Sequence, residues 1–187
     1  GSVSVLIGNG NGGFTHAASY YNVGNLAYTS ALGDFNHDGN LDIVVANAGS
    51  SYASVLINNG DGTFQARVDY ALQAASNAVA VGDVDGDGNL DFVTADGSSG
   101  KVSVLLGNGD GTFQAETAFA AGSRDKGIAL ADMNEDGNLD IIVGNSRDPS
   151  AGPSTNSVSV LLGDGHGGFG APIVLSAGWD TYNVAVA

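Results

Sequence analysis

Three nine-residue segments of this chain carry oxygen-bearing side chains at alternate positions. They read DFNHDGNLD, DVDGDGNLD and DMNEDGNLD, and they begin at Asp34, Asp83 and Asp132, 49 residues apart. Positions 1, 3, 5, 7 and 9 hold Asp or Asn, and position 6 is always Gly. Ca²⁺ takes about six to eight oxygen ligands, and a tight loop can point alternate residues at one centre. We therefore predict three calcium sites, one in each segment.

The expected ligands are the residues at the odd positions of each loop, with the backbone carbonyl serving at position 7 of the first loop. They are Asp34, Asn36, Asp38, Asn40 and Asp42; Asp83, Asp85, Asp87, Asn89 and Asp91; and Asp132, Asn134, Asp136, Asn138 and Asp140. The glycine at position 6 permits the sharp bend. The leucine at position 8 (Leu41, Leu90 or Leu139) is expected to point inward and anchor the loop to the blade core.

Other interpretations of the loops are weaker. An EF-hand needs a Glu at position 12 and helical flanks, whereas position 12 is Val45, Thr94 or Val143 here. Mg²⁺ prefers fewer protein ligands and more water than these loops provide. Solvated Asp-Gly turns without a metal are the remaining alternative, but three copies at one spacing favour a dedicated ion site.

Four short segments recur in fixed order around each loop. They are rich in β-branched residues, lack helical periodicity and are flanked by Gly, Asn or Asp, which is typical of strands. The first precedes the loop (28–32, 78–81, 128–130 and 184–187), and the second follows it (41–46, 90–94 and 139–143). The third spans 2–8, 53–58, 102–107 and 158–163, and the fourth starts at Phe14, Phe64, Phe113 and Phe169. Glycine-rich hairpins join the third to the fourth.

These segments predict an all-β fold. A lone four-stranded meander cannot cover both of its faces, but copies stacked around an axis can. We predict a β-propeller of four-stranded antiparallel blades, with about 3.5–4 blades in this chain, as a partial ring or one completed by another copy. Residues 1–27 are the outer strands of a split blade, 28–77, 78–126 and 127–182 are complete repeats, and 183–187 are the first strand of the split blade. All acidic loops should then share one face.

The charge of the chain restricts its partners. Acidic residues outnumber basic ones by 20 to 5, giving a net charge of −15, and eleven of the 20 lie in the three loops. Bound cations would offset the repulsion within the loops, and so acidic a chain is not expected to bind nucleic acid. No membrane span and no signal peptide are expected from the hydropathy pattern. The absence of cysteine excludes disulfides and thiolate ligands.

No constellation of catalytic residues is evident. His16, His37 and His166 are not paired with a nucleophile, and we expect them to lie on the surface, so the chain is predicted not to be an enzyme. The aspartates of the glycine-rich hairpins fit turn chemistry.

The face opposite the acidic loops is the candidate surface for a glycan or protein ligand. It should hold the long loop 145–157, Arg124, Lys126 and the single tryptophan, Trp179. Arginine can clamp a carboxylate, and an exposed indole can stack on a sugar. The alternative is that Trp179 covers the end of the propeller core.

The loops, the LDIVV, LDFVT and LDIIV strands after them, and the VSVLLGNGDGTF segment together resemble the FG-GAP repeat, also called the VCBS-type repeat. The namesake letters are nearly present at Phe169-Gly170-Ala171-Pro172. This repeat forms the propellers of integrin α-subunits and of many secreted bacterial proteins. The resemblance covers essentially the whole chain and implies blades stabilised by calcium, with a role in adhesion, binding or scaffolding.

The expected function follows from the loops and the resemblance. Extracellular modules bind calcium with dissociation constants of about 10⁻⁴–10⁻³ M, which cytosolic calcium would not fill. We therefore expect a secreted or cell-surface calcium-binding module for adhesion, for glycan or protein binding, or for scaffolding. Two alternatives are a self-assembling surface or filament subunit with strands exchanged between copies, and an accessory module of a polysaccharide-degrading enzyme.

Overall fold

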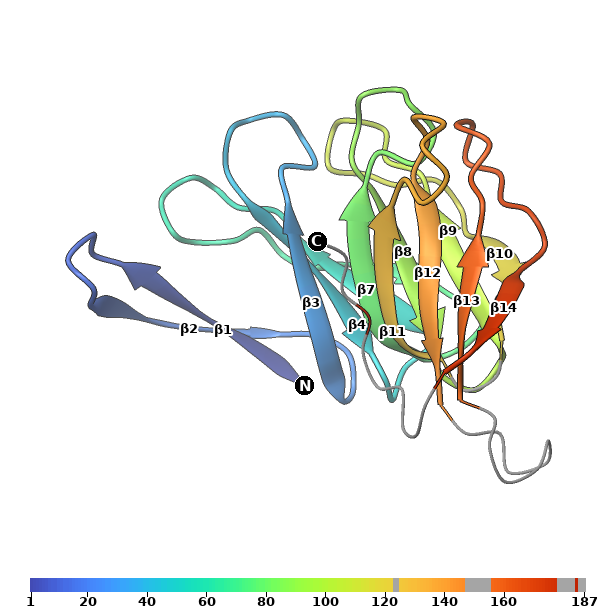
Figure 1. The fold of residues 1–187 in the computed structure, drawn as a ribbon. Helices are drawn as coiled ribbons and strands as arrows, with labels where there is room; N and C mark the ends of the chain where they lie inside the picture. Colours follow the sequence, from blue (N-terminus) through green and yellow to red (C-terminus); the bar gives the residue numbers. More distant parts are fainter. Residues whose placement is uncertain (123–124, 147–155, 178–183, 185–187) are drawn as a thin grey trace.

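The computed structural model describes residues 1–122, 125–146, 156–177 and 184, without the side chains of 15–20 and 125–126. All regular structure in these residues is β-strand (Figure 1). The fold is all-β, as the sequence predicts. Trp179, Arg124, most of the loop 145–157 and all of the strand expected at 183–187 except Val184 lie outside the described residues. Within the described residues no helix is long and apolar enough to cross a membrane.

Twelve of the strands form three antiparallel blades with the strands in sequence order. Blade 1 contains β3 (Ala27–Gly33), β4 (Asp42–Asn47), β5 (Tyr52–Leu56) and β6 (Val68–Ala71). Blade 2 contains β7 (Ser76–Gly82), β8 (Asp91–Asp96), β9 (Lys101–Leu105) and β10 (Thr117–Ala120). Blade 3 contains β11 (Asp125–Ala131), β12 (Asp140–Asn145), β13 (Ser157–Leu161) and β14 (Ile173–Ser176). A separate hairpin pairs β1 (Ser2–Gly8) with β2 (Phe14–Asn22). This is a partial propeller.

The blades pack side by side through their first two strands. β7 contacts β3 and β4 of the blade before it, and β11 contacts β7 and β8 in the same way. The second strands β4, β8 and β12 are buried along their whole length, which their continuous apolar runs require because both sheet faces are covered.

Each inter-blade space is filled by apolar side chains from both neighbours. Between blades 1 and 2, Phe35 and Val44 pack with Phe92 and Phe113. The rings of Phe92 and Phe113 meet edge to face with centroids 4.7 Å apart, and Phe35 and Phe113 at 5.1 Å. Edge-to-face pairs add about 0.5–1.5 kcal/mol beyond burial. This packing fixes how one acidic loop stands relative to the next.

The fourth strands begin later than the phenylalanines predict. Phe64, Phe113 and Phe169 form isolated bridges to the end of the third strand, and regular pairing resumes only at Val68, Thr117 and Ile173. In blade 3 Pro172 lies in this interval and has no N–H to donate to a ladder. Only β2 starts at its phenylalanine, Phe14.

Candidate metal centre

The three acidic loops, named loop 1 (34–42), loop 2 (83–91) and loop 3 (132–140), join the first strand to the second in their blades and lie along one edge of the structure (Figure 1). Position 4 is left-handed in each, with φ of 57° at His37, 75° at Gly86 and 61° at Glu135. The glycine at position 6 has φ of 84°, 90° and 90° in loops 1, 2 and 3. Two left-handed residues curl each loop on itself, which explains the invariant glycine.

Position 6 gives a stability prediction. A Cβ at Gly137 would meet nothing within 4 Å, so Gly137→Ala changes only the backbone energy. Its φ of 90° should make this substitution cost about 1–2 kcal/mol of unfolding free energy, measured by urea denaturation. Gly8→Ala is the matched control, because its Cβ also meets nothing and its φ is not in the left-handed range. Equal effects of both substitutions would contradict the argument.

The aspartate at position 1 organises its loop from inside. Asp34 accepts the backbone N–H groups of Asp38 at 3.0 Å and Gly39 at 2.8 Å. Asp132 accepts the equivalent pair in loop 3, and Asp83 accepts those of Gly86 and Gly88 in loop 2. These bonds turn the odd-numbered oxygens toward the centre of the loop.

The aspartate at position 9 is a buried clamp. Asp42, Asp91 and Asp140 are fully buried, and each accepts one N–H from position 2 of its loop and one from the end of the third strand. For Asp91 the two donors are Val84 at 2.8 Å and Gly107 at 2.7 Å. Each carboxylate oxygen still has a second lone pair for a cation. Position 9 therefore ties the loop to the sheet whether or not it also binds metal.

Carboxylates converge most closely in loop 2. Oxygens of Asp83, Asp85 and Asp91 lie within 4.8 Å of one another. Burial, followed by the charges of Asp85 and Asp83, raises the pKa of Asp91 to about 6 despite its two N–H bonds. Burial and the neighbouring Asp87 and Asp83 also raise the pKa of Asp85. No basic residue occurs between 83 and 91 to offset this charge. Hard oxygen donors without a protein cation fit a divalent ion such as Ca²⁺.

Loops 1 and 3 carry one carboxylate fewer than loop 2 among their expected ligands. Asn36 and Asn134 stand where loop 2 has Asp85, and each donates its side-chain amide to the aspartate at position 5, at 3.0 and 2.8 Å. The backbone N–H of Asn40, followed by Asn36, lowers the pKa of Asp38. The structure brings the predicted residues of each loop into one turn, while their role as ligands stays a prediction.

Loops 1 and 2 are also in contact with the blade that follows each of them. The backbone N–H of Gly111, in the hairpin of blade 2, donates to the carbonyl of Phe35 in loop 1 at 2.9 Å. A Cβ on Gly111 would lie 3.6 Å from Asn36, and a Cβ on Gly167 in the next hairpin would lie 3.6 Å from Asp85. Because glycine has no side chain, the backbone of each of these hairpins packs closely against the loop of the preceding blade. The acidic loops share one face, as predicted, and the glycine-rich hairpins lie on it too.

The burial of position 2 depends on that contact. Phe35 and Val84 are 2% exposed, whereas Met133 of loop 3 is 50% exposed. Among the described residues no hairpin follows blade 3. Loop 3 is consequently the most open of the three.

The expectation for the leucines at position 8 is confirmed in blades 2 and 3 and is wrong in blade 1. Leu90 and Leu139 pack against core clusters formed by their own blade and the preceding one. Their Cδ1 atoms lie 2.9 Å and 2.8 Å from Cβ positions built on Gly33 and Gly82 of the preceding blade. Leu41 is 57% exposed. Among the described residues no complete blade precedes blade 1, so Leu41 has no inter-blade cluster to join.

His37 has a contact that sequence reasoning missed. Its Nε2 lies 2.9 Å from Oδ1 of Asn89, at position 7 of the next loop. A histidine at position 4 gives no signal of this in the sequence of one loop, because the contact depends on how two blades pack. His166, by contrast, lies in a turn where its backbone N–H donates to Asp164 at 2.8 Å.

A second polar cluster lies at the opposite end of the blades, where the second strands finish. In blade 1, Asn47 Nδ2 donates to Ser54 Oγ at 3.1 Å, and Ser54 donates to Asp69 at 2.7 Å. In blade 3, Asn145 Nδ2 donates to Ser159 Oγ at 2.8 Å. In both blades the asparagine side-chain amide donates to the serine hydroxyl, and in blade 1 the serine then donates to Asp69.

Blade 2 has Asp96 in place of the asparagine. Asp96 and Ser103 are fully buried, and Ser103 Oγ lies 2.9 Å from Asp96 and 2.6 Å from Glu116. One hydroxyl hydrogen can satisfy only one of two carboxylates, so the contacts are balanced when Asp96 carries a proton. Burial raises the pKa of Asp96 to about 6; the Glu116 charge adds to the rise, while the Ser103 bond opposes it.

Comparison with known proteins places these features in a family. The model of the FG-GAP-like repeat matches residues 34–94 and again 83–143, which is more than half of the chain and covers all three acidic loops. The chain belongs to the FG-GAP-like repeat family. The two overlapping matches each run from one acidic loop through the next, so the family's unit is the repeat observed here as a blade with its loop.

A solved lectin structure resembles this FG-GAP-like chain in fold. A lectin of Agrocybe aegerita, described as recognising non-reducing terminal N-acetylglucosamine, superposes with a TM-score of 0.55 at 23% identity over 94% of this chain. The chain spans 46% of that lectin's length. A Tc holotoxin pore of Photorhabdus luminescens matches at a TM-score of 0.39 and 19% identity, over 93% of this chain and 10% of the toxin chain. No curated protein matches the sequence.

Proposed function

We propose that this chain is a calcium-stabilised, non-catalytic binding module of an extracellular protein. The observation that carries the proposal is the convergence of Asp83, Asp85 and Asp91 in loop 2 without any basic side chain in the loop. Calcium is structural: it offsets the repulsion that raises the pKa of Asp85 and Asp91 and so holds each loop closed. Extracellular calcium is high enough to fill sites of ordinary module affinity, and cytosolic calcium is not.

Isothermal titration of the metal-free chain with calcium tests this function. Saturable binding at three sites is expected, one for each loop. A triple variant with Asp38→Asn, Asp87→Asn and Asp136→Asn removes position 5 from every loop and should bind none. Absence of binding heat for the unchanged chain, or equal binding by the triple variant, would contradict the proposal.

The three sites should differ in affinity. Loop 2 has four carboxylates and is covered by the following hairpin, whereas loop 3 has three among its expected ligands and an exposed Met133. A variant that keeps only loop 2 (Asp38→Asn with Asp136→Asn) should bind calcium about tenfold more tightly than one that keeps only loop 3 (Asp38→Asn with Asp87→Asn). Equal dissociation constants would show that neither charge nor cover matters.

We further propose that the module recognises a glycan or protein on the face opposite the acidic loops. The lectin likeness supports the glycan option, since that protein recognises terminal N-acetylglucosamine. A glycan array that includes this sugar, probed in calcium with the unchanged chain and with Trp179→Ala, checks it. Binding that Trp179→Ala abolishes is expected, and an array without any signal above background would contradict the glycan option.

A further inference from the structure

Loop 1 and loop 2 are joined across the boundary between their blades by one side-chain contact. His37 Nε2 lies 2.9 Å from Asn89 Oδ1. The Nδ2 atom of the same amide lies 2.8 Å from Asp87 Oδ2. An ionised carboxylate only accepts hydrogen bonds, so the amide nitrogen faces Asp87 and the amide oxygen faces His37. His37 is therefore the donor, with a hydrogen on Nε2.

Asn89 carries this contact on to position 5 of loop 2. Its backbone N–H donates to Asp87 Oδ1 at 2.8 Å, while its side chain donates to Oδ2. The backbone N–H is the largest of the causes that lower the pKa of Asp87, and the side-chain amide acts in the same direction. The backbone carbonyl of Asn89 takes part in none of these bonds, so it is the oxygen that position 7 can offer to an ion. His37 thus orients an expected ligand of loop 2 through its neighbour.

The left-handed bend at position 4 directs the side chain there toward the following blade. His37 has φ of 57° and Gly86, at the same position of loop 2, has φ of 75°. A Cβ built on Gly86 would lie 3.6 Å from the carbonyl oxygen of Gly165, in the hairpin of blade 3. A Cβ on Gly165 would in turn meet the side chain of Asn138, at position 7 of loop 3. A side chain at position 4 is therefore aimed at the next hairpin and at the asparagine beside it.

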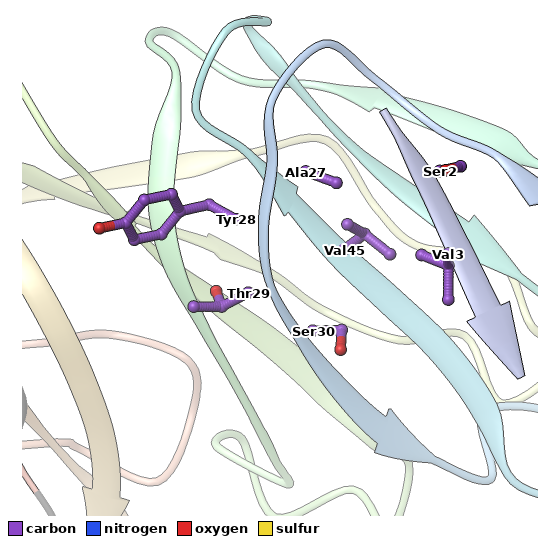
Figure 2. Close-up of a pocket in the computed structure, with 7 residues that line it drawn as sticks. All are labelled: Ser2, Val3, Ala27, Tyr28, Thr29, Ser30 and Val45. Atoms are coloured by element: carbon purple, nitrogen blue, oxygen red, sulfur yellow. The ribbon is translucent and has the colours of Figure 1, made fainter. Parts of the chain in front are cut away.

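Among the described residues only loop 1 uses this geometry. Loop 2 has glycine at position 4, and no described hairpin follows Glu135 of loop 3. Before blade 1 there is no described acidic loop; a hollow of about 220 Å³ lies between β1, β3 and β4, with Val3, Ala27 and Val45 grouped around it (Figure 2). The array therefore contains one linked pair, loops 1 and 2, and one unlinked pair, loops 2 and 3.

His37 is also tied to the expected ion of its own loop. It stands between Asn36 and Asp38, the expected ligands at positions 3 and 5. Asn36 Nδ2 lies 3.0 Å from Asp38 Oδ2, and the backbone N–H of Asp38 donates to Asp34 at 3.0 Å. An ion held by positions 3 and 5 fixes the backbone on both sides of His37. Less freedom is then lost when the imidazole takes its place beside Asn89, and such a saving couples two sites.

We propose that His37 is a positioning residue for the calcium site of loop 2, and that through it calcium in loop 1 strengthens the binding of calcium in loop 2. This coupling rests on the proposed calcium function. Because coupling between two sites is reciprocal, loop 2 strengthens loop 1 by the same factor. A single exposed hydrogen bond gives a factor of about five. Loops 2 and 3 lack this coupling.

Calcium titrations followed by NMR measure the coupling, with the backbone amides of Gly39, Gly88 and Gly137 reporting on loops 1, 2 and 3 separately. Asp136→Asn leaves loops 1 and 2, and Asp38→Asn added to it leaves loop 2 alone. The dissociation constant of loop 2 in the second chain is divided by that in the first. This ratio is expected to be about five times larger with His37 than with His37→Ala. Comparing ratios cancels the repulsion between two ions and the direct effect of Asp38→Asn.

His37→Gln is the conservative control, because its side-chain amide keeps an N–H donor near the Nε2 position. It should retain most of the coupling that His37→Ala loses. The metal-free chain gives a further readout: His37→Ala should shift the side-chain amide signals of Asn89 more than His37→Gln does. Equal ratios for His37 and His37→Ala, or a His37→Gln chain as uncoupled as His37→Ala, would overturn the coupling and leave calcium binding intact. A chain whose three glycine signals ignore calcium would overturn the proposed function together with the coupling.

Gly86→His extends the test to the unlinked pair. Position 7 of loop 3 is Asn138, as it is Asn89 in loop 2, and the one contact a Cβ at Gly86 would make is with the carbonyl of Gly165. In a chain that keeps loops 2 and 3 (Asp38→Asn), Gly86→His should tighten loop 3 relative to Gly86→Ala. The alanine carries the same left-handed strain without the imidazole. Equal affinity of loop 3 in the two variants would contradict the role given to position 4.

Discussion

Chelation of calcium is expected to lower the melting temperature of this chain by about 10–20 °C. At roughly 2 mM calcium and a dissociation constant near 0.1 mM, each site contributes about 1.8 kcal/mol by mass action, and three sites about 5 kcal/mol. For a chain of this size each kcal/mol is worth about 2–4 °C. The physical cause is that eleven of the 20 acidic residues are crowded into three turns.

Scanning calorimetry in calcium and in excess EDTA measures this effect. The triple variant with Asp38→Asn, Asp87→Asn and Asp136→Asn is the control, since its melting temperature should not respond to EDTA. Magnesium at the same concentration should restore less of the stability, because it keeps more of its water. The same melting temperature with and without chelator would contradict the proposal that calcium stabilises the blades.

Replacement of Asp96 by asparagine is expected to stabilise the chain at neutral pH by up to about 3 kcal/mol, from a pKa that rises from 3.8 to about 6. The folded state holds the Asp96 proton more tightly than the unfolded state does. Its contribution is therefore fully present below pH 3.8 and is lost as pH rises through about 6. The introduced asparagine amide would donate to Ser103 at every pH, as Asn47 donates to Ser54 in blade 1.

Urea denaturation between pH 4 and 8 measures the difference in unfolding free energy between Asp96→Asn and the unchanged chain. Saturating calcium is present so that Asp91, which lies at the proposed calcium site, does not add its own titration. The described polar and charged groups around Asp96 are Thr94, Ser99, Ser103 and Glu116, with Ser76 and Lys101 opposite it on the two neighbouring strands. The unchanged chain should lose stability relative to Asp96→Asn between pH 4 and about 6. Parallel profiles for Asp96→Asn and the unchanged chain would contradict the assignment of the proton.

The strands and loops could be predicted because their signals are local and repeated. The run from Leu41 to Ala46 is apolar throughout apart from the clamp Asp42, so it had to be a strand covered on both faces, and β4 is. The left-handed bend at position 6 follows from glycine alone. Three copies also fixed the order of strands within a blade, since each loop is preceded and followed by the same segments.

Features that depend on neighbouring blades could not be predicted in this way. Leu41 and Leu90 stand at the same loop position, yet only Leu90 finds a preceding blade to pack on. The contact between His37 and Asn89 likewise joins two repeats. Asp96 is different, because the sequence did hold a signal: it replaces an asparagine that both other repeats carry at this position.

The contact of each glycine-rich hairpin with the loop of the preceding blade gives the array a direction. Shortening the chain by one blade from its carboxyl end would take the cover from Val84 and leave loop 2 as open as loop 3 is now. Shortening it from its amino end would keep the hairpin cover of every remaining loop, and loop 2 would lose only the contacts of Asn89 and Leu90 with blade 1. Truncation series made from the two ends should therefore lose metal affinity in different orders, and protease should cut first at the loop nearest the carboxyl end.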